Sequence, residues 1–404
     1  MTHILTQLGH ISVEQFMSQY WQKKPLLIRQ AFPALQDDSH PLRLSPQQLF
    51  DLAAQDDVES RLITHFRKRW EVAHGPFEID ELPETRQKNW TLLVQGVNLH
   101  NPQIAALMRA FRFVSDTRLD DVMISYATDG GGVGPHFDSY DVFLLQARGQ
   151  RHWQISAQKN QTLRDDVPLK ILADFVCEEE WTLEPGDMLY LPPHYAHNGI
   201  AKGECMTYSV GFRAPGLSML SQRFLEFFAE HLEAITDQDR TYKNKDESLT
   251  KTPAKLPQTM IDTVSKQLRR TRWNKDLIEQ FLGQFNSEPK SNVFFDPPAK
   301  TMSLVQFVKT LSRQGCHLHD KSLLLYRGQR FYINGEPIIS SAPYFTRALK
   351  QLANERHLPA LQFAQAVDIE PTADQALLEL LYDWYCAGWL SCGSLLQLDL
   401  PLIS

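Results

Sequence analysis

The sequence lacks most of the features that mark secreted, membrane-bound or metal-clustered proteins. Its five cysteines are an odd number, lie scattered over 404 residues and form no C-x-x-C pair, which argues against a disulfide framework or a cysteine zinc site. No hydrophobic run approaches the roughly 18 residues that a transmembrane helix needs, and the N-terminal stretch has no charged segment followed by an apolar one. We therefore expect a cytoplasmic protein with reduced thiols and no membrane partner.

An excess of positive charge is also missing. The formal net charge of −7 and the pI near 6.1 argue against broad electrostatic capture of nucleic acid but leave a local basic patch open. Hydrophobic residues (43%) and charged residues (22%) have the shares of an ordinary globular protein, and no internal repeat or low-complexity tract is found. A chain of this length exceeds one typical domain, so we expect two or three units.

The first half of the chain changes from a mixed texture to a β-rich one. Residues 1–115 combine helical and extended signals, among them a capped helix start with proline in its first turn at Ser45-Pro46. Residues 118–214 alternate short strands with turn residues, which is typical of a closed or sandwiched antiparallel barrel. Within them, Ala147-Arg148-Gly149-Gln150 predicts a hairpin turn. The expected fold class is α+β with a mainly β core.

The second half turns helical. Apolar residues at helical spacing over 220–232, and a second helical pattern over 260–285, indicate either a docking or dimerisation layer or helices that simply pack on the barrel. From about residue 292, helical segments around a hairpin with an Asn334-Gly335 turn suit a winged-helix fold. That fold often binds nucleic acid, but fold alone is an analogy. We divide the chain into a β-rich domain at 1–214, a helical region at 215–290 and a winged-helix-like domain at 291–404.

The segment from Gly130 to Asp138 carries the first chemical signal. A phosphate-cradling loop would continue with lysine and serine or threonine into a helix, whereas here Pro135 and a strand-like run follow the glycines. The glycines instead allow the backbone to approach a site that begins with His136 and Asp138. In a strand these two residues point to the same side, so that they can bind one metal ion. Such an H-x-D pair is weak evidence by itself.

A third ligand candidate lies downstream, where His194-Tyr195-Ala196-His197 follows a strand, a turn and a strand. A late barrel strand can present one of these two histidines opposite the H-x-D pair. Two histidines and one carboxylate leave coordination positions open for a keto acid and dioxygen, as in non-haem iron(II) oxygenases. The alternative is that His136 caps a turn, Asp138 serves a loop and His197 is an ordinary core residue.

An oxygenase that uses 2-oxoglutarate also needs a cation for the far carboxylate of that cosubstrate. Arg148, Arg151 and Lys170 are the candidates. An inward-facing arginine binds a carboxylate through two hydrogen bonds. We favour Arg151 because it begins the strand that returns toward the metal site, whereas Arg148 lies in the predicted turn. The alternative is that Arg151 is a solvated hairpin residue.

Longer motifs carry a resemblance to a known family. They are DDVMIS at 120–125, GGVGPHFDSYDVF at 131–143 and YSVGFR at 208–213, with WQKKP at 21–25, SRL at 60–62 and HGPF at 74–77 upstream. With these motifs the chain resembles the bacterial ribosomal oxygenases, JmjC-type arginine hydroxylases that act on the large-subunit ribosomal protein L-sixteen. The likeness runs through most of residues 15–215 and more loosely to the C-terminus.

The resemblance implies a fold and a set of cofactors. The fold is a JmjC, cupin-like double-stranded β-helix, followed by a helical dimerisation region of a homodimer and a C-terminal winged helix. The cofactor is Fe(II), and 2-oxoglutarate and O2 are the cosubstrates. Carried over position by position, His136, Asp138 and His197 are the iron ligands. Arg151 grips the far carboxylate of 2-oxoglutarate, and Ser125 lines the same pocket.

The resemblance also implies the substrate site. Asp121, Met123, Tyr140 and Ser209 surround an arginine of a ribosomal protein substrate, on whose β-carbon the enzyme adds a hydroxyl group. A guanidinium favours a carboxylate and a flat ring as partners, which Asp121 and Tyr140 supply. The chain departs from a relative at Thr207, where an amide stands in that relative, so one hydrogen bond to the cosubstrate stays open.

Two rival functions remain from the sequence. The same oxygenase chemistry can act on a histidine or an asparagine of another protein, and only the pocket of Asp121 and Tyr140 argues for arginine. A non-catalytic module that keeps the barrel and binds nucleic acid or a partner through its winged helix is the more remote reading. The complete ligand set and Arg151 argue against it.

Overall fold

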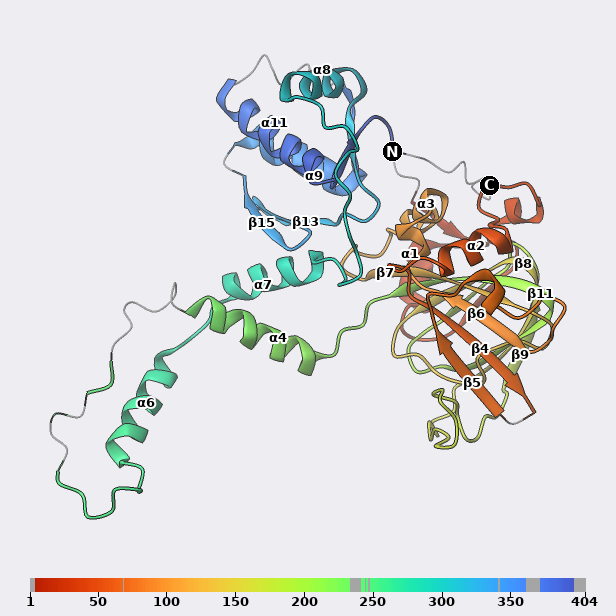
Figure 1. The fold of residues 1–404 in the computed structure, drawn as a ribbon, viewed down its shortest axis with the longest axis horizontal. Coiled ribbons are helices and arrows are strands. Elements are labelled where there is room, and N and C mark those ends of the chain that lie inside the picture. The colour runs from red at the N-terminus through yellow and green to blue at the C-terminus, as the bar shows by residue number, and fades with distance from the viewer. Residues whose placement is uncertain are drawn as a thin grey trace.

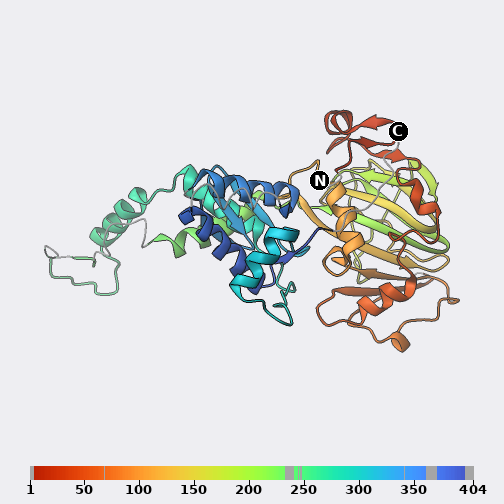
Figure 2. The ribbon, with the colours of Figure 1, turned by 90° about the horizontal axis from the view of Figure 1, so that it is seen from above.

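The computed structural model describes residues 4–67, 69–232, 241–243, 245, 248–340, 342–360 and 371–395. The molecule is elongated, with a β-rich barrel at one end and a smaller C-terminal domain beside it (Figures 1 and 2). Helices α4 (Leu217–Glu230) and α6 (Gln258–Arg270) extend away from the barrel. Among the described residues, no helix combines the length and the apolar character needed to cross a membrane.

One antiparallel sheet forms the barrel. Its strand order is β3-β10-β8-β11-β7-β6-β4-β5, and β9 is added along β8. The strands are β3 (Leu26–Ile28), β4 (Ser60–Phe66), β5 (Arg69–His74), β6 (Trp90–Val94), β7 (Leu119–Ala127), β8 (Val142–Ser156), β9 (Glu179–Leu183), β10 (Met188–Leu191) and β11 (Ala196–Phe212).

Strand β8 runs without interruption through residues 147–150, so the predicted hairpin turn there is wrong. Gly149 has a φ of +58° and faces the place where the register of β11 shifts, between Lys202 and Met206. A Cβ atom on Gly149 would lie 2.0 Å from the carbonyl oxygen of Glu204. Glycine therefore allows a bulge that bends the strand instead of reversing it. The first half of β8 pairs with β10 and the second half with β9.

The bend folds the two halves of β8 over a shared apolar interior. Val142 and Leu144 from the first half belong to the same buried cluster as Trp153 and Ile155 from the second. The other face of the large sheet is buried under side chains of the N-terminal segments. These segments contain β1 (Gln7–Leu8), β2 (Ile11–Ser12), α1 (Val13–Gln19), η1 (Pro33–Gln36), α2 (Pro46–Ala53), η3 (Val97–Leu99) and α3 (Pro102–Ala110), and η2 (Ile79–Glu81) contributes no buried residue. The predicted helix start is confirmed, since Ser45 caps α2 and Pro46 is its first residue.

The helical pattern predicted over 260–285 divides into α6 and α7 (Lys275–Ser287), separated by residues 271–274. Helix α4 packs against α7 through an aromatic and aliphatic cluster that includes Phe224, Phe228 and Phe281. Helix α7 in turn contacts the β13–β15 sheet of the C-terminal domain. No residue of α6 is buried.

The C-terminal domain has its own core, centred on Phe307, Leu349 and Trp384. Its strands form two three-stranded sheets, β16-β12-β17 and β13-β14-β15, and the predicted Asn334-Gly335 turn joins β14 to β15. Its elements are α8 (Leu304–Gln314), β12 (Cys316–Leu318), β13 (Leu324–Arg327), β14 (Arg330–Ile333), β15 (Glu336–Ile339), α9 (Pro343–Glu355), β16 (His357–Leu358), α11 (Pro371–Cys386) and β17 (Leu390–Cys392).

Candidate active site

The three candidate metal ligands meet at the beginning of β11. His197 lies on that strand, and its backbone exchanges two hydrogen bonds with His136, of 2.9 and 2.8 Å. Asp138 Oδ2 lies 3.7 Å from His197 Nε2. One ligand atom from each of these three residues lies within 4.8 Å of the other two. The group can therefore hold one metal ion. His194, the other histidine that the sequence left open, is exposed.

The route by which His136 and Asp138 reach the site differs from the prediction. Both lie outside the named strands, and His136 forms only an isolated bridge with His197. The expected close approach of the glycine segment is present, because a Cβ atom on Gly132 would lie 2.5 Å from the carbonyl oxygen of Gly199. The absence of side chains, rather than the alternation of a strand, lets this segment lie against β11.

The hydrogen bonds of the two histidines prepare them for a metal. Nδ1 of His136 lies 2.9 Å from the carbonyl oxygen of Gly134, and Nδ1 of His197 lies 2.9 Å from that of Tyr195. A carbonyl oxygen only accepts, so each Nδ1 donates and each Nε2 keeps its lone pair. Burial lowers the pKa of His197 most, and the neighbouring His136 lowers it further. A neutral, oriented imidazole is the form that binds metal.

Arg151 lies inside the barrel, on the second half of β8. It is 5% exposed, and its Nη1 donates to Ser125 Oγ at 3.0 Å. Its Nε and Nη2 are buried and have no hydrogen-bond partner among the described residues. Two unsatisfied donors on a buried cation are costly, so this site fits an anionic ligand such as the far carboxylate of 2-oxoglutarate. Of its rivals, Lys170 is exposed and Arg148 is partly exposed.

Ser125 belongs to a row of polar side chains across the barrel. It pairs with Thr207 of β11, as Met123 pairs with Ser209, so Ser125 and Met123 lie two residues apart on one face of β7. Thr207 Oγ1 donates to Gln146 Oε1 at 2.9 Å. Gln146 is fully buried, so an amide stands next to Thr207 on the neighbouring strand.

Two residues of this interior were missed from the sequence. Gln146 interrupts an apolar run of β8, and a polar residue in such a run is a usable signal for a lined pocket. Trp153 follows Arg151 by two residues on the same strand face. Its ring centroid lies 5.7 Å from the Arg151 guanidinium carbon and 5.8 Å from the His197 ring. Trp153 therefore separates the candidate metal site from the arginine by one ring.

Asp121 and Tyr140, two of the predicted substrate residues, lie close to each other and to the candidate metal ligand Asp138. The Asp121 carboxylate accepts a hydrogen bond from the Gly96 backbone at 3.2 Å, and burial raises its pKa. Burial also raises the pKa of the Tyr140 hydroxyl, and the charges of Asp138 and Asp121 raise it further. Tyr140 is thus close to both a candidate metal ligand and the carboxylate expected to receive a guanidinium.

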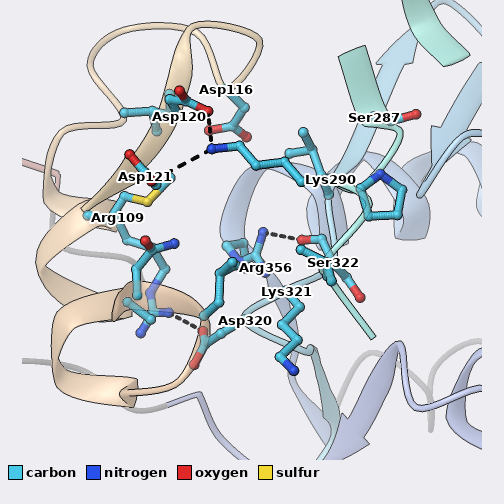
Figure 3. A pocket seen from close by; sticks show the side chains of 18 of the residues that line it. Arg109, Asp116, Asp120, Asp121, Ser287, Lys290, Asp320, Lys321, Ser322 and Arg356 are labelled. Carbon is cyan, nitrogen blue, oxygen red and sulfur yellow. Dashed lines mark hydrogen bonds and ion pairs between the residues drawn. The ribbon is translucent and has the colours of Figure 1, made fainter. Parts of the chain in front are cut away.

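Lys290 is a neighbour of Asp121 that the sequence did not indicate. Its Nζ lies 3.6 Å from Asp121 Oδ2 and 2.9 Å from Asp120 Oδ1. Figure 3 shows this contact at a cavity of about 110 Å³ between the barrel and the C-terminal domain. Because Lys290 is distant from β7 in the sequence and lies in no motif, only the tertiary structure places it there.

Comparisons with known proteins agree with this arrangement. The family model of the JmjC domain matches residues 106–220, and that of the ROXA-like winged helix matches residues 270–391. The ribosomal protein uL16 3-hydroxylase of Escherichia coli is 35% identical over 382 residues, which cover 92% of this chain and 97% of the relative. A probable ribosomal oxygenase of Haemophilus influenzae is 29% identical, covering 94% of this chain and 96% of the relative.

Solved structures give the same result. An X-ray structure of E. coli YcfD matches with a TM-score of 0.79 and 32% identity, covering 95% of this chain and 99% of that one. The ribosomal oxygenase YcfD of E. coli in complex with cobalt and 2-oxoglutarate matches with a TM-score of 0.76 and 31% identity, covering 95% and 98%. The similarity therefore extends over both the barrel and the C-terminal domain.

Proposed function

The chain belongs to the ribosomal oxygenase family of JmjC-domain proteins, and from this we propose that it hydroxylates the β-carbon of an arginine in a ribosomal protein of the L-sixteen (uL16) type. The reaction depends on Fe(II), 2-oxoglutarate and O2. The observation that carries the proposal is Arg151, a buried cation with two unsatisfied donors, in the same barrel as a group of two histidines and a carboxylate that can hold a metal.

In this proposal each residue of the barrel interior has one task. The Nε2 atoms of His136 and His197 and the carboxylate of Asp138 hold Fe(II). Arg151 receives the far carboxylate of 2-oxoglutarate through its Nε and Nη2 atoms, which supplies the charge-assisted hydrogen bonds that they lack. Ser125 keeps the guanidinium in place through the bond to Nη1. The fixed tautomers of the histidines keep both ligands ready before iron binds.

The substrate arginine enters from the side of Asp121. Its guanidinium pairs with that carboxylate and lies against the ring of Tyr140, while Met123 and Ser209 border the aliphatic part of its side chain. These contacts direct one methylene toward the metal ligands, which is a positioning effect. When bound, iron and 2-oxoglutarate supply the oxidising chemistry with O2: one oxygen atom enters the substrate, and 2-oxoglutarate leaves as succinate and CO2. The apolar barrel interior around Trp153 excludes water.

The test uses synthetic peptides and mass spectrometry. The full-length protein, loaded with Fe(II) and 2-oxoglutarate in air, is expected to add one oxygen atom to an arginine peptide of uL16, and fragmentation should place that atom on the β-carbon. The H197A variant serves as the inactive control. A wild-type protein that binds metal and 2-oxoglutarate but hydroxylates only histidine or asparagine peptides would refute the substrate assignment and leave the chemistry intact.

We also propose that the protein is a cytoplasmic homodimer that divides into a catalytic domain at 1–214, a helical dimerisation region at 215–290 and a winged-helix domain at 291–404. Support comes from α6, whose apolar side chains Met260, Ile261, Val264 and Leu268 are all exposed. Their spacing puts them along one helix face. A second copy of the chain would cover that face.

A further inference from the structure

Lys290 extends from the C-terminal half of the molecule into the candidate substrate site. It lies just after α7, in a segment that lines the cavity between the barrel and the C-terminal domain. Figure 3 shows its side chain reaching across to the carboxylates of Asp120 and Asp121. The two contacts are unequal. Nζ is 2.9 Å from Asp120 and 3.6 Å from Asp121, so only the former has hydrogen-bond length.

Of the two carboxylates, Asp121 is the one that needs a cation. Its side chain is 15% exposed against 33% for Asp120. Burial raises the pKa of Asp121, and Lys290 acts in the opposite direction. Asp120 has a second cationic partner, because Arg213 Nε lies 3.4 Å from its Oδ1. The four groups together carry no net charge, and Asp121 depends on Lys290 more than Asp120 does.

The segment that carries Lys290 has further attachments to the barrel. The Asn292 side chain donates to the backbone oxygen of Asp57 at 3.3 Å, and Arg213 Nη1 donates to the backbone oxygen of Asn286 at 3.2 Å. The Lys290 side chain can therefore move without release of the segment. A small shift that keeps the short contact to Asp120 would break the longer contact to Asp121.

We propose that Lys290 is a built-in competitor of the substrate: it occupies the cation position beside Asp121 when substrate is absent and cedes it to the substrate guanidinium. The proposal rests on the proposed function, since it takes an arginine as the substrate. A guanidinium that binds Asp121 through two hydrogen bonds outcompetes an ammonium group at 3.6 Å. Lys290 then stays with Asp120, close enough to repel the new cation. A neutral side chain neither competes with Lys290 for the charge of Asp121 nor is repelled by it.

A competing charge on Lys290 predicts that peptide affinity rises when the charge is removed, which a merely structural role of Lys290 does not predict. Removal of the Lys290 charge removes both a competitor for Asp121 and a repulsive charge beside the guanidinium. We expect the K290M variant to bind an arginine peptide about three- to tenfold more tightly, from like-charge repulsion at a partly solvated site. Binding of the same peptide with citrulline, which has the shape of arginine without the charge, should not change.

The experiment measures peptide binding by fluorescence anisotropy, using the full-length protein with Mn(II) and 2-oxoglutarate without oxygen, so that no turnover occurs. K290R, which keeps the charge, should behave as the wild type. So should K321M, because Lys321 lines the same cavity but donates to the backbone oxygen of Phe294. Circular dichroism and the 2-oxoglutarate-induced thermal shift verify that each variant is folded.

The outcomes separate the two proposals. If the wild type prefers the arginine peptide over the citrulline peptide and K290M binds it with equal or lower affinity, the role of Lys290 is overturned and the proposed function stands. If the wild type shows no preference for arginine, both are overturned. Should K290M fail to fold, K290Q removes the same charge and provides the same comparison. An unchanged arginine affinity in K290Q contradicts the proposal.

Discussion

Replacing Arg151 with methionine should separate the stability of the protein from its affinity for 2-oxoglutarate. Arg151 is 5% exposed and keeps one side-chain hydrogen bond, to Ser125. Loss of that bond costs about 1 kcal/mol, and Ser125 retains its contact with the Thr207 backbone. Replacing a buried charged group with an apolar one of similar size is often neutral or stabilising by about 1–4 kcal/mol. The ligand-free R151M variant should therefore be at least as stable as the wild type.

The effect on cosubstrate binding has the opposite sign. Each hydrogen bond to a charged group contributes about 1.5–3 kcal/mol, so losing those from Nε and Nη2 should weaken 2-oxoglutarate binding by about 100-fold or more. At a cosubstrate concentration of about 100 times the wild-type Kd, the wild type gains about 2.7 kcal/mol of stability. A variant with a 100-fold higher Kd gains only about 0.4 kcal/mol under the same conditions.

Thermal unfolding with Mn(II), with and without 2-oxoglutarate, measures both effects, and isothermal titration calorimetry gives the Kd directly. R148M is the matched control, because Arg148 lies on the same strand and was a rival candidate. It should keep the wild-type affinity for 2-oxoglutarate. An R151M variant that keeps the full cosubstrate-induced shift, or that is several kcal/mol less stable without ligand, would refute the reasoning.

Three further predictions follow from other parts of the molecule. D121N should lower turnover of an arginine peptide by about tenfold or more, since a charged partner is lost, while peptide-independent loss of 2-oxoglutarate stays at the wild-type rate; equal loss of both would contradict a substrate role. L268D, on the exposed face of α6, should convert a dimer to a monomer in light scattering, whereas L249D, in a segment outside the helices, should not. Burial lowers the pKa of His317 in the C-terminal domain, so the unfolded chain binds the proton first as the pH falls below about 6.5, and stability is lost in that range. The thermal unfolding midpoint of this domain should decrease as the pH is lowered from about 7 to about 5, and it should decrease less in H317Q. An equal decrease in both proteins would show that His317 is not responsible.

Local features of the sequence were sufficient where local chemistry decides the structure. The Ser45-Pro46 helix start and the Asn334-Gly335 turn are as predicted, because caps and tight turns depend on a few neighbouring residues. The residue types of the candidate metal site could also be identified from the sequence, and the structure brings His136, Asp138 and His197 close enough together to hold one metal ion. The predicted turn at Gly149 is wrong because glycine serves a turn and a bulge equally well, and the partner strand decides between them.

What the sequence could not determine depends on contacts between distant segments. The sequence could name Arg151, but the two unsatisfied donors of that side chain appear only when the fold buries it against Ser125 of β7. It could name Asp121, but its partner Lys290 follows it by more than 160 residues, after a helical region and in no motif. The sequence by itself determined which chemical groups are present. The tertiary structure decided which of them are buried together, and burial sets the need of each charge for a partner.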